Sequence, residues 1–199
     1  MIEENAGQIN VPEFVANTLT AIRSCRELEL IQPTLMLIYS LIDILAYLGL
    51  PPENKDTWAK KSGFESWVNT YMLGESSRIR CTARDLYASR CSVLHCGSTH
   101  SDLSRQKKAK QIFYAFGQYG AENLQEFIDA AKFGDYEDVV VLQIDGHLLP
   151  ALVEGMAIFF GSSFQEKQAH TIQAKIKRMI GKSKVTENEI IALNKVLKR

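Results

Sequence analysis

A permanent positive charge lies within an apolar helical stripe between Cys81 and Gly97 (CTARDLYASRCSVLHCG). An α-helix turns by roughly 100° per residue, which gathers the apolar side chains of this segment onto one side. These side chains are Ala83, Leu86, Tyr87, Cys91, Val93 and Leu94, and Arg90 falls near the middle of them. An arginine cannot be neutralised by losing its proton, and burying it without a partner is costly. The chain must therefore either supply a carboxylate to Arg90 or expose this stripe at a surface that uses the charge.

His95 lies on the flank of the same stripe, beside Arg84 on the helix surface. Arg90-Cys-Ser-Val-Leu-His95 fits an R-x4-6-H motif, and the preceding residues from Asp85 are typical of the helix that carries it. In these features the chain resembles the HEPN superfamily. The resemblance implies an α-helical bundle, commonly homodimeric, and many members are metal-independent endoribonucleases. Active nucleases of that superfamily usually carry a polar residue directly after the arginine, often Asn or Asp, where this chain has Cys91.

The resemblance implies a role for each residue of the motif. Ribonucleases of this type use the 2′-hydroxyl of the substrate as nucleophile, so the protein moves protons and stabilises negative charge. His95 would be the general acid and base. Arg90 would hold the scissile phosphate, and Arg84 would be a further phosphate contact. In such families the arginines and histidines of two subunits meet at the dimer interface, which would make the Arg90 stripe the dimer face.

A second interpretation is that Arg90 is structural. Asp43 is the only charged residue in the apolar run 35–50, and it is the candidate for an ion pair with Arg90 inside the monomer. Breaking a buried ion pair typically costs about 3–5 kcal/mol, so such a pair could matter for folding alone. The chain would then be a non-catalytic HEPN-like binding or assembly module. The two interpretations are compatible, and Cys91 favours the second.

The sequence gives little support for a metal site or a cofactor. Cys91, His95, Cys96 and His100 have the spacing C-x3-H-C-x3-H, but the two cysteine–histidine pairs point in different directions on a helix and Gly97 is expected to end it. Small cysteines packed in the core beside a free histidine are favoured over zinc, so we expect no metal. No P-loop, GxGxxG, G-x-S-x-G or HExxH motif is present. We therefore expect no cofactor.

Composition limits the partners and the compartment. Lysine plus arginine equals aspartate plus glutamate, 23 each, which argues against a protein that coats long nucleic acid. The four cysteines follow no disulfide pattern and the acidic N-terminus is not a signal peptide, so we expect a cytoplasmic protein. The run from Leu35 to Leu50 is interrupted by Ser40 and Asp43, which indicates a buried core helix rather than a membrane span. The expected partners are a second copy of the chain, an RNA substrate and, by resemblance, an antitoxin or a nucleotidyltransferase.

The pattern along the chain predicts a mainly α protein, a helical bundle with a minor two-stranded β element. Two β-branched or aromatic runs, Lys110–Phe116 and Val139–Ile144, are the expected strands. The other expected segments are helices at about 10–29, 33–49, 62–74, 81–97, 121–133 and 148–180, and a short C-terminal helical extension at 182–199. We expect a single HEPN-like domain over residues 1–199. The lysines before the first strand (Lys107, Lys108 and Lys110) are interpreted as a solvated face rather than as a nucleic-acid surface.

Overall fold

The structure is a computed structural model that describes residues 13–51, 58–74, 77–97, 101–117, 129, 139–162 and 166–179. The described chain is mainly α-helical with one two-stranded sheet, which confirms the predicted fold class. It divides into two compact units, Met1–Ser163 and Phe164–Arg199. The first unit contains every described element except helix α8 (Glu166–Met179). The single domain over 1–199 stays a prediction, and the expected C-terminal helix at 182–199 lies outside the described residues.

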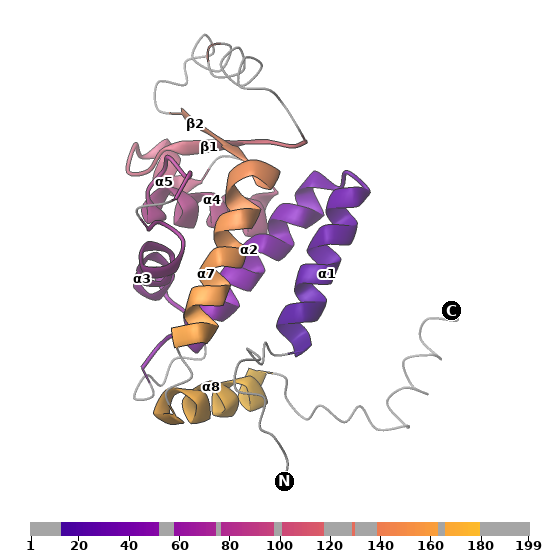
Figure 1. Ribbon diagram of the computed structural model, residues 1–199. Helices are drawn as coiled ribbons and strands as arrows, with labels where there is room; N and C mark the ends of the chain where they lie inside the picture. Colours follow the sequence, from indigo (N-terminus) through magenta and orange to yellow (C-terminus); the bar gives the residue numbers. More distant parts are fainter. Residues whose placement is uncertain are drawn as a thin grey trace, which may run out of the picture. The chain divides into compact units, whose positions relative to one another are not determined.

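Helix α2 (Ile31–Leu48) is the central helix of the first unit. It packs against α1 (Glu13–Glu27), α3 (Lys61–Tyr71), α4 (Ala83–Cys96) and α7 (Leu149–Ser162), as Figure 1 shows. Its apolar side chains fill the core, with Leu35, Ile38, Leu41, Ile42 and Leu45 almost completely buried. Each such side chain contributes about 1.5–3 kcal/mol when it leaves water. The burial of this helix explains the apolar run in the sequence.

Two helices begin earlier than predicted. Helix α2 begins at Ile31, which leaves Pro33 within the first turn, where a missing N–H does no harm. The segment Ser62-Gly-Phe-Glu65 matches a capping-box pattern, and a cap at Ser62 predicted from it is wrong: α3 begins at Lys61 after Lys60, which makes no side-chain cap. The carboxylate of Glu65 lies 3.6 Å from Arg84 Nε and 3.8 Å from Lys61 Nζ. It therefore forms ion pairs instead of capping the helix.

Helices α3 and α7 approach each other closely. The Trp67 and Tyr71 rings of α3 pack against Phe159 of α7, with centroids 6.1 and 5.3 Å away. Gly155 of α7 makes this possible, since a Cβ there would lie 2.8 Å from the carbonyl oxygen of Tyr71. A larger residue at this position would push the two helices apart.

The two strands are parallel and lie at one end of the first unit (Figure 1). Strand β1 (Gln111–Ala115) pairs with β2 (Val139–Gln143) in a register that joins Gln111 to Val139. Both strands occur where the β-branched and aromatic runs predicted them. The expected helix at 121–133 lies outside the described residues, apart from Asp129.

The chain does not make a simple turn after β2. A π-helical turn, η1 (Ile144–Leu148), leads directly into α7. The pair Asp145-Gly146 is typical of a turn, but π-helical geometry has no simple sequence signature. The structure describes two helices, α7 and α8, where one helix from 148 to 180 was expected, and residues 163–165 between them lie outside the described residues.

Two described stretches, Ile31–Leu48 and Ile144–Gly161, are long and apolar enough to cross a membrane by length and composition. About half of each is buried inside the molecule, at 56% and 44%. Core helices of globular proteins have the same properties, so these stretches are only a weak indication of a membrane span. The absence of a membrane partner and the cytoplasmic location stay predictions.

Candidate functional site

Helix α4 carries the motif and is held at both ends. At its start, Asp85 Oδ2 accepts hydrogen bonds from the Thr82 N–H (2.8 Å) and the Thr82 hydroxyl (2.7 Å). Asp85 Oδ1 accepts a third from the Lys110 N–H at 2.6 Å, which ties the helix to the start of β1. At its end, Gly97 has a φ of 59°, a left-handed conformation that glycine adopts without strain. The predicted helix end at Gly97 is correct.

Arg90 is paired with Asp43 across helices α4 and α2. Its Nε and Nη2 donate to the same oxygen, Asp43 Oδ2, at 2.8 and 2.5 Å. Only 21% of each side chain is exposed. Asp43 Oδ1 is buried and, within the described part of the chain, accepts no hydrogen bond. The arginine within the apolar stripe is thus compensated inside the chain, by the carboxylate that the sequence singled out.

The pKa values of this pair reflect its burial. Burial raises the pKa of Asp43 above its ordinary value, although the hydrogen bond and the charge of Arg90 act in the opposite direction. Burial by itself lowers the pKa of Arg90, but the hydrogen bond and the charge of Asp43 outweigh it and raise that pKa. Arg90 therefore keeps its charge, and part of the cost of burial falls on Asp43.

The other edge of Arg90 faces His95. Arg90 Nη1 lies 3.2 Å from His95 Nε2, and His95 is exposed to solvent. A guanidinium can only donate hydrogen bonds, so Nε2 is the acceptor in this contact and carries no proton there. Cys91 Sγ lies 4.0 Å from the same Nη1, as a weak acceptor next to the imidazole. Arg90 therefore connects a buried carboxylate to an imidazole at the surface.

Arg84 is not part of this cluster. Positions 84 and 90 project about 120° apart on an ideal helix, and Arg84 pairs instead with Glu65 of α3. More than half of the Arg84 side chain is exposed. The structure thus brings together Arg90, His95 and Asp43 and leaves Arg84 near the start of α4, in an ion pair of its own. The role of Arg84 as a phosphate contact stays a prediction.

A buried cluster of hydroxyl groups lies between helices α2 and α4 and strand β1. The Tyr114 hydroxyl shares one hydrogen bond with the Tyr39 hydroxyl and another, of 2.5 Å, with Ser89 Oγ. Burial raises the pKa of both tyrosines, so they stay protonated at neutral pH. Tyr39 and Tyr114 are 75 residues apart in the sequence, so no local pattern connects them. The cluster fixes the turn of α4 that precedes Arg90.

We expect Tyr114→Phe to lower the free energy of unfolding by about 1–3 kcal/mol, because two buried hydroxyls lose their partner. Ser89→Ala should lower the free energy of unfolding by less, since Tyr39 and Tyr114 keep the hydrogen bond between their hydroxyls. Chemical denaturation of both variants measures the effect, and Tyr71→Phe on α3 is the matched control. Equal stability of Tyr114→Phe and the wild type would show that the cluster does not hold the fold.

Three of the four cysteines, Cys25, Cys81 and Cys91, are free thiols. No group of three or more His, Cys, Asp or Glu residues that could hold a metal ion occurs within the described ranges. His100 and the side chain of Cys96 lie outside those ranges, so the C-x3-H-C-x3-H spacing is not tested.

Burial and the nearby charge of Asp85 raise the pKa of the buried Cys81 thiol to about 12. Because the thiolate is the reactive form, we expect iodoacetamide to leave Cys81 unmodified at mildly alkaline pH and to modify it once the protein is unfolded. The raised pKa also means that this thiol's contribution to stability is present below pH 9 and is lost as the pH rises toward 12. Peptide mapping by mass spectrometry measures the modification, and rapid modification of Cys81 in the native protein would contradict this burial.

A comparison with protein-family models finds no matching family, and searches among curated proteins and solved structures find no match to the chain either.

Proposed function

We propose that this protein is a metal-independent endoribonuclease of the toxin or defence type. The observation that carries the proposal is the contact of 3.2 Å between Arg90 Nη1 and Nε2 of the exposed His95. A general acid or base must reach solvent or substrate, and a guanidinium beside it can hold the phosphoryl oxygens on which charge develops. The HEPN resemblance supports the same assignment, because these two residues are the ones its motif contains.

The geometry suggests how the two residues would divide the work. The guanidinium of Arg90 is partly occupied: its Nε and Nη2 donate to Asp43, which leaves Nη1 as the edge directed toward His95 and the surface. A substrate phosphate would bind at this edge. His95, with an unprotonated Nε2, would accept the proton of the substrate 2′-hydroxyl as the cyclic phosphate forms. Asp43 would hold the guanidinium in place and would not touch the substrate.

A homodimer would contain two copies of this site. Exposed apolar side chains occur at the turn between α1 and α2, namely Leu28, Leu30 and Ile31, and at Met36 of α2. Met36 is seven residues from Asp43, so both project from nearly the same side of α2. A Cβ at Gly97, two residues after His95, would lie 3.6 Å from Gln32 in the first turn of α2. Burying this apolar surface against a second copy would bring two Arg90–His95 pairs together.

The wider setting of the proposal comes from the resemblance alone. Proteins of this kind often work beside an antitoxin or a nucleotidyltransferase, and we propose such a partner in the cytoplasm. It would act by covering the Arg90–His95 surface or by modifying it.

A non-catalytic binding or assembly module is the second candidate. The ion pair between Arg90 and Asp43 favours it, because the pair gives Arg90 a structural reason to be in the apolar stripe without any substrate. Cys91, at a position where nucleases usually have Asn or Asp, favours it as well.

Incubating the purified protein with single-stranded RNA in excess EDTA separates the two candidates. The nuclease proposal predicts cleavage, because none of its steps uses a metal ion. Sedimentation analysis of the same sample should show a dimer. Intact RNA at high enzyme concentration would favour the binding module.

A further inference from the structure

A cavity of about 520 Å³ opens beside the first turn of α4, between α3 and the segment 107–110 that precedes β1. Its lining is mainly basic, with four cationic side chains, Arg84, Lys107, Lys108 and Lys110, against two acidic ones, Glu65 and Asp85. The whole chain has equal numbers of basic and acidic residues, so this surplus is local. A cavity of this size can hold a ligand as large as a nucleotide.

The two acidic residues of the cavity both have partners, and most of these partners also line the cavity. Both oxygens of Asp85 are occupied by hydrogen bonds from Thr82 and from the Lys110 N–H. The Glu65 carboxylate lies between Arg84 and Lys61, with Lys61 outside the lining of the cavity. Because Arg84 is paired with Glu65, the remaining surplus of positive charge comes from the three lysines against Asp85, and an anion is the ligand that this surplus favours.

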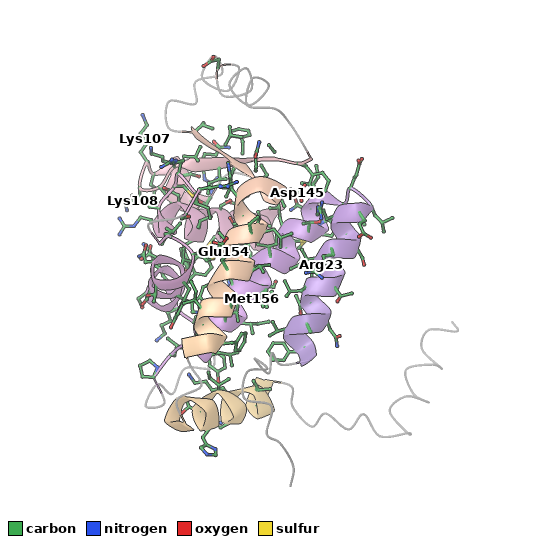
Figure 2. The ribbon with its side chains drawn as sticks, in the orientation of Figure 1. Arg23, Lys107, Lys108, Asp145, Glu154 and Met156 are labelled. Atoms are coloured by element: carbon green, nitrogen blue, oxygen red, sulfur yellow. The ribbon has the colours of Figure 1, made fainter. Side chains whose placement is uncertain are left out.

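The lysine segment is held in place by its backbone. The Lys107 N–H donates to the Ser104 carbonyl and the Lys108 N–H to the Leu103 carbonyl, each at 2.9 Å. Lys107 has a φ of 54°, a conformation uncommon for residues other than glycine. Figure 2 shows the side chains of Lys107 and Lys108 directed outward at the edge of the molecule, away from α1 with Arg23. The cations are thus presented from a fixed turn to the outside.

The cavity and the Arg90–His95 site lie along the same helix. Positions 84 and 95 are eleven residues apart, which separates them by about 16 Å along the axis and by only about 20° around it. At about 3.4 Å per stacked nucleotide, this distance corresponds to about five nucleotides. We infer that the basic cavity binds the backbone phosphates of single-stranded RNA about five nucleotides from the bond that is cut. The inference rests on the proposed function, and it implies that the substrate is an oligonucleotide rather than a dinucleotide.

RNA with 2′-O-methyl groups lacks the nucleophile and cannot be cut, so it measures binding alone. Fluorescence anisotropy would compare oligonucleotides of about four and about ten nucleotides at several salt concentrations. The wild type should bind the longer one more tightly. Each phosphate contact on a single strand contributes about 0.7 to the slope of log K against log salt. Lys108→Ala should lower the slope for the longer RNA by about that amount, and Lys108→Ala/Lys110→Ala by about twice as much.

Arg23→Ala is the matched control, because it removes one exposed cation from the other side of the molecule (Figure 2). An unchanged slope in Lys108→Ala/Lys110→Ala would overturn the inference, as would equal binding of the shorter and the longer RNA. Failure of the two proposals can be told apart. If the protein cleaves unmodified RNA but the slope is unchanged, the inference about the cavity fails and the nuclease proposal stands. If the slopes change as predicted but no RNA is cleaved, the cavity is an RNA site and the nuclease proposal fails.

Discussion

His95→Ala is expected to lower the rate of RNA cleavage by about 10²–10⁴-fold, the usual contribution of a general acid or base. The same substitution should hardly change the stability, because His95 is exposed and its described side-chain contact is the one with Arg90 Nη1. Exposed substitutions usually change the free energy of unfolding by less than about 0.5 kcal/mol. Cleavage of a fluorescent single-stranded RNA gives the rate, and thermal unfolding gives the stability.

His170→Ala is the matched control for this prediction. His170 is also exposed, but it belongs to helix α8 of the second compact unit. The His170→Ala variant should cleave RNA at the wild-type rate. Full activity in His95→Ala, or an equal loss in His170→Ala, would rule out the imidazole of His95 as the proton carrier.

Arg90→Ala should lower the free energy of unfolding by about 3 kcal/mol, at the lower end of the range for buried pairs because a fifth of each side chain is exposed. Most of this loss in the free energy of unfolding arises because Asp43 is left as a buried carboxylate without its Arg90 partner. Its pKa is already raised by burial, and losing the hydrogen bond and the charge of Arg90 would raise it further. A raised pKa makes the protonated form favourable in the folded state, so the deficit of Arg90→Ala should shrink as the pH falls from neutral toward 4.

Two further variants show whether Asp43 is the cause. Adding Asp43→Asn to Arg90→Ala removes the buried charge and should recover part of the stability at neutral pH, with little remaining pH dependence. Arg84→Ala, which breaks a partly exposed ion pair between α4 and α3, should lower the free energy of unfolding by less than about 1 kcal/mol. Wild-type stability of Arg90→Ala at neutral pH would show that the ion pair contributes nothing to folding. Urea unfolding at two pH values measures all four proteins.

Much of the fold follows from local patterns in the sequence. The strands lie where β-branched and aromatic residues cluster, and α4 ends where Gly97 can adopt a left-handed conformation. Asp43 could be named as the partner of Arg90 because a single charge in an apolar helix needs a partner of opposite charge. These inferences succeeded because each depends on the conformational or electrostatic preference of one or two residues.

The features that the sequence did not reveal depend on contacts between distant segments. The Tyr114 hydroxyl reaches Tyr39 and Ser89 only because β1 packs on α4. The basic cavity forms because Asp85 accepts a hydrogen bond from the Lys110 N–H and so brings the lysines next to Arg84. From the sequence these lysines were interpreted as a solvated face, but in the structure they line this cavity. The Ser62 capping box failed because Glu65 pairs with Arg84, which is distant in sequence.

The most direct test of the central proposal is to identify the ends of the RNA fragments that the protein produces in excess EDTA. Attack by the substrate 2′-hydroxyl, assisted by the Arg90–His95 pair, predicts 2′,3′-cyclic phosphate ends from the wild type and almost none from His95→Ala. Mass spectrometry of the fragments distinguishes these ends from the 3′-hydroxyl ends that water attack with the opposite polarity would leave. Cyclic ends formed equally by both proteins, or no fragments from either, would contradict the proposal.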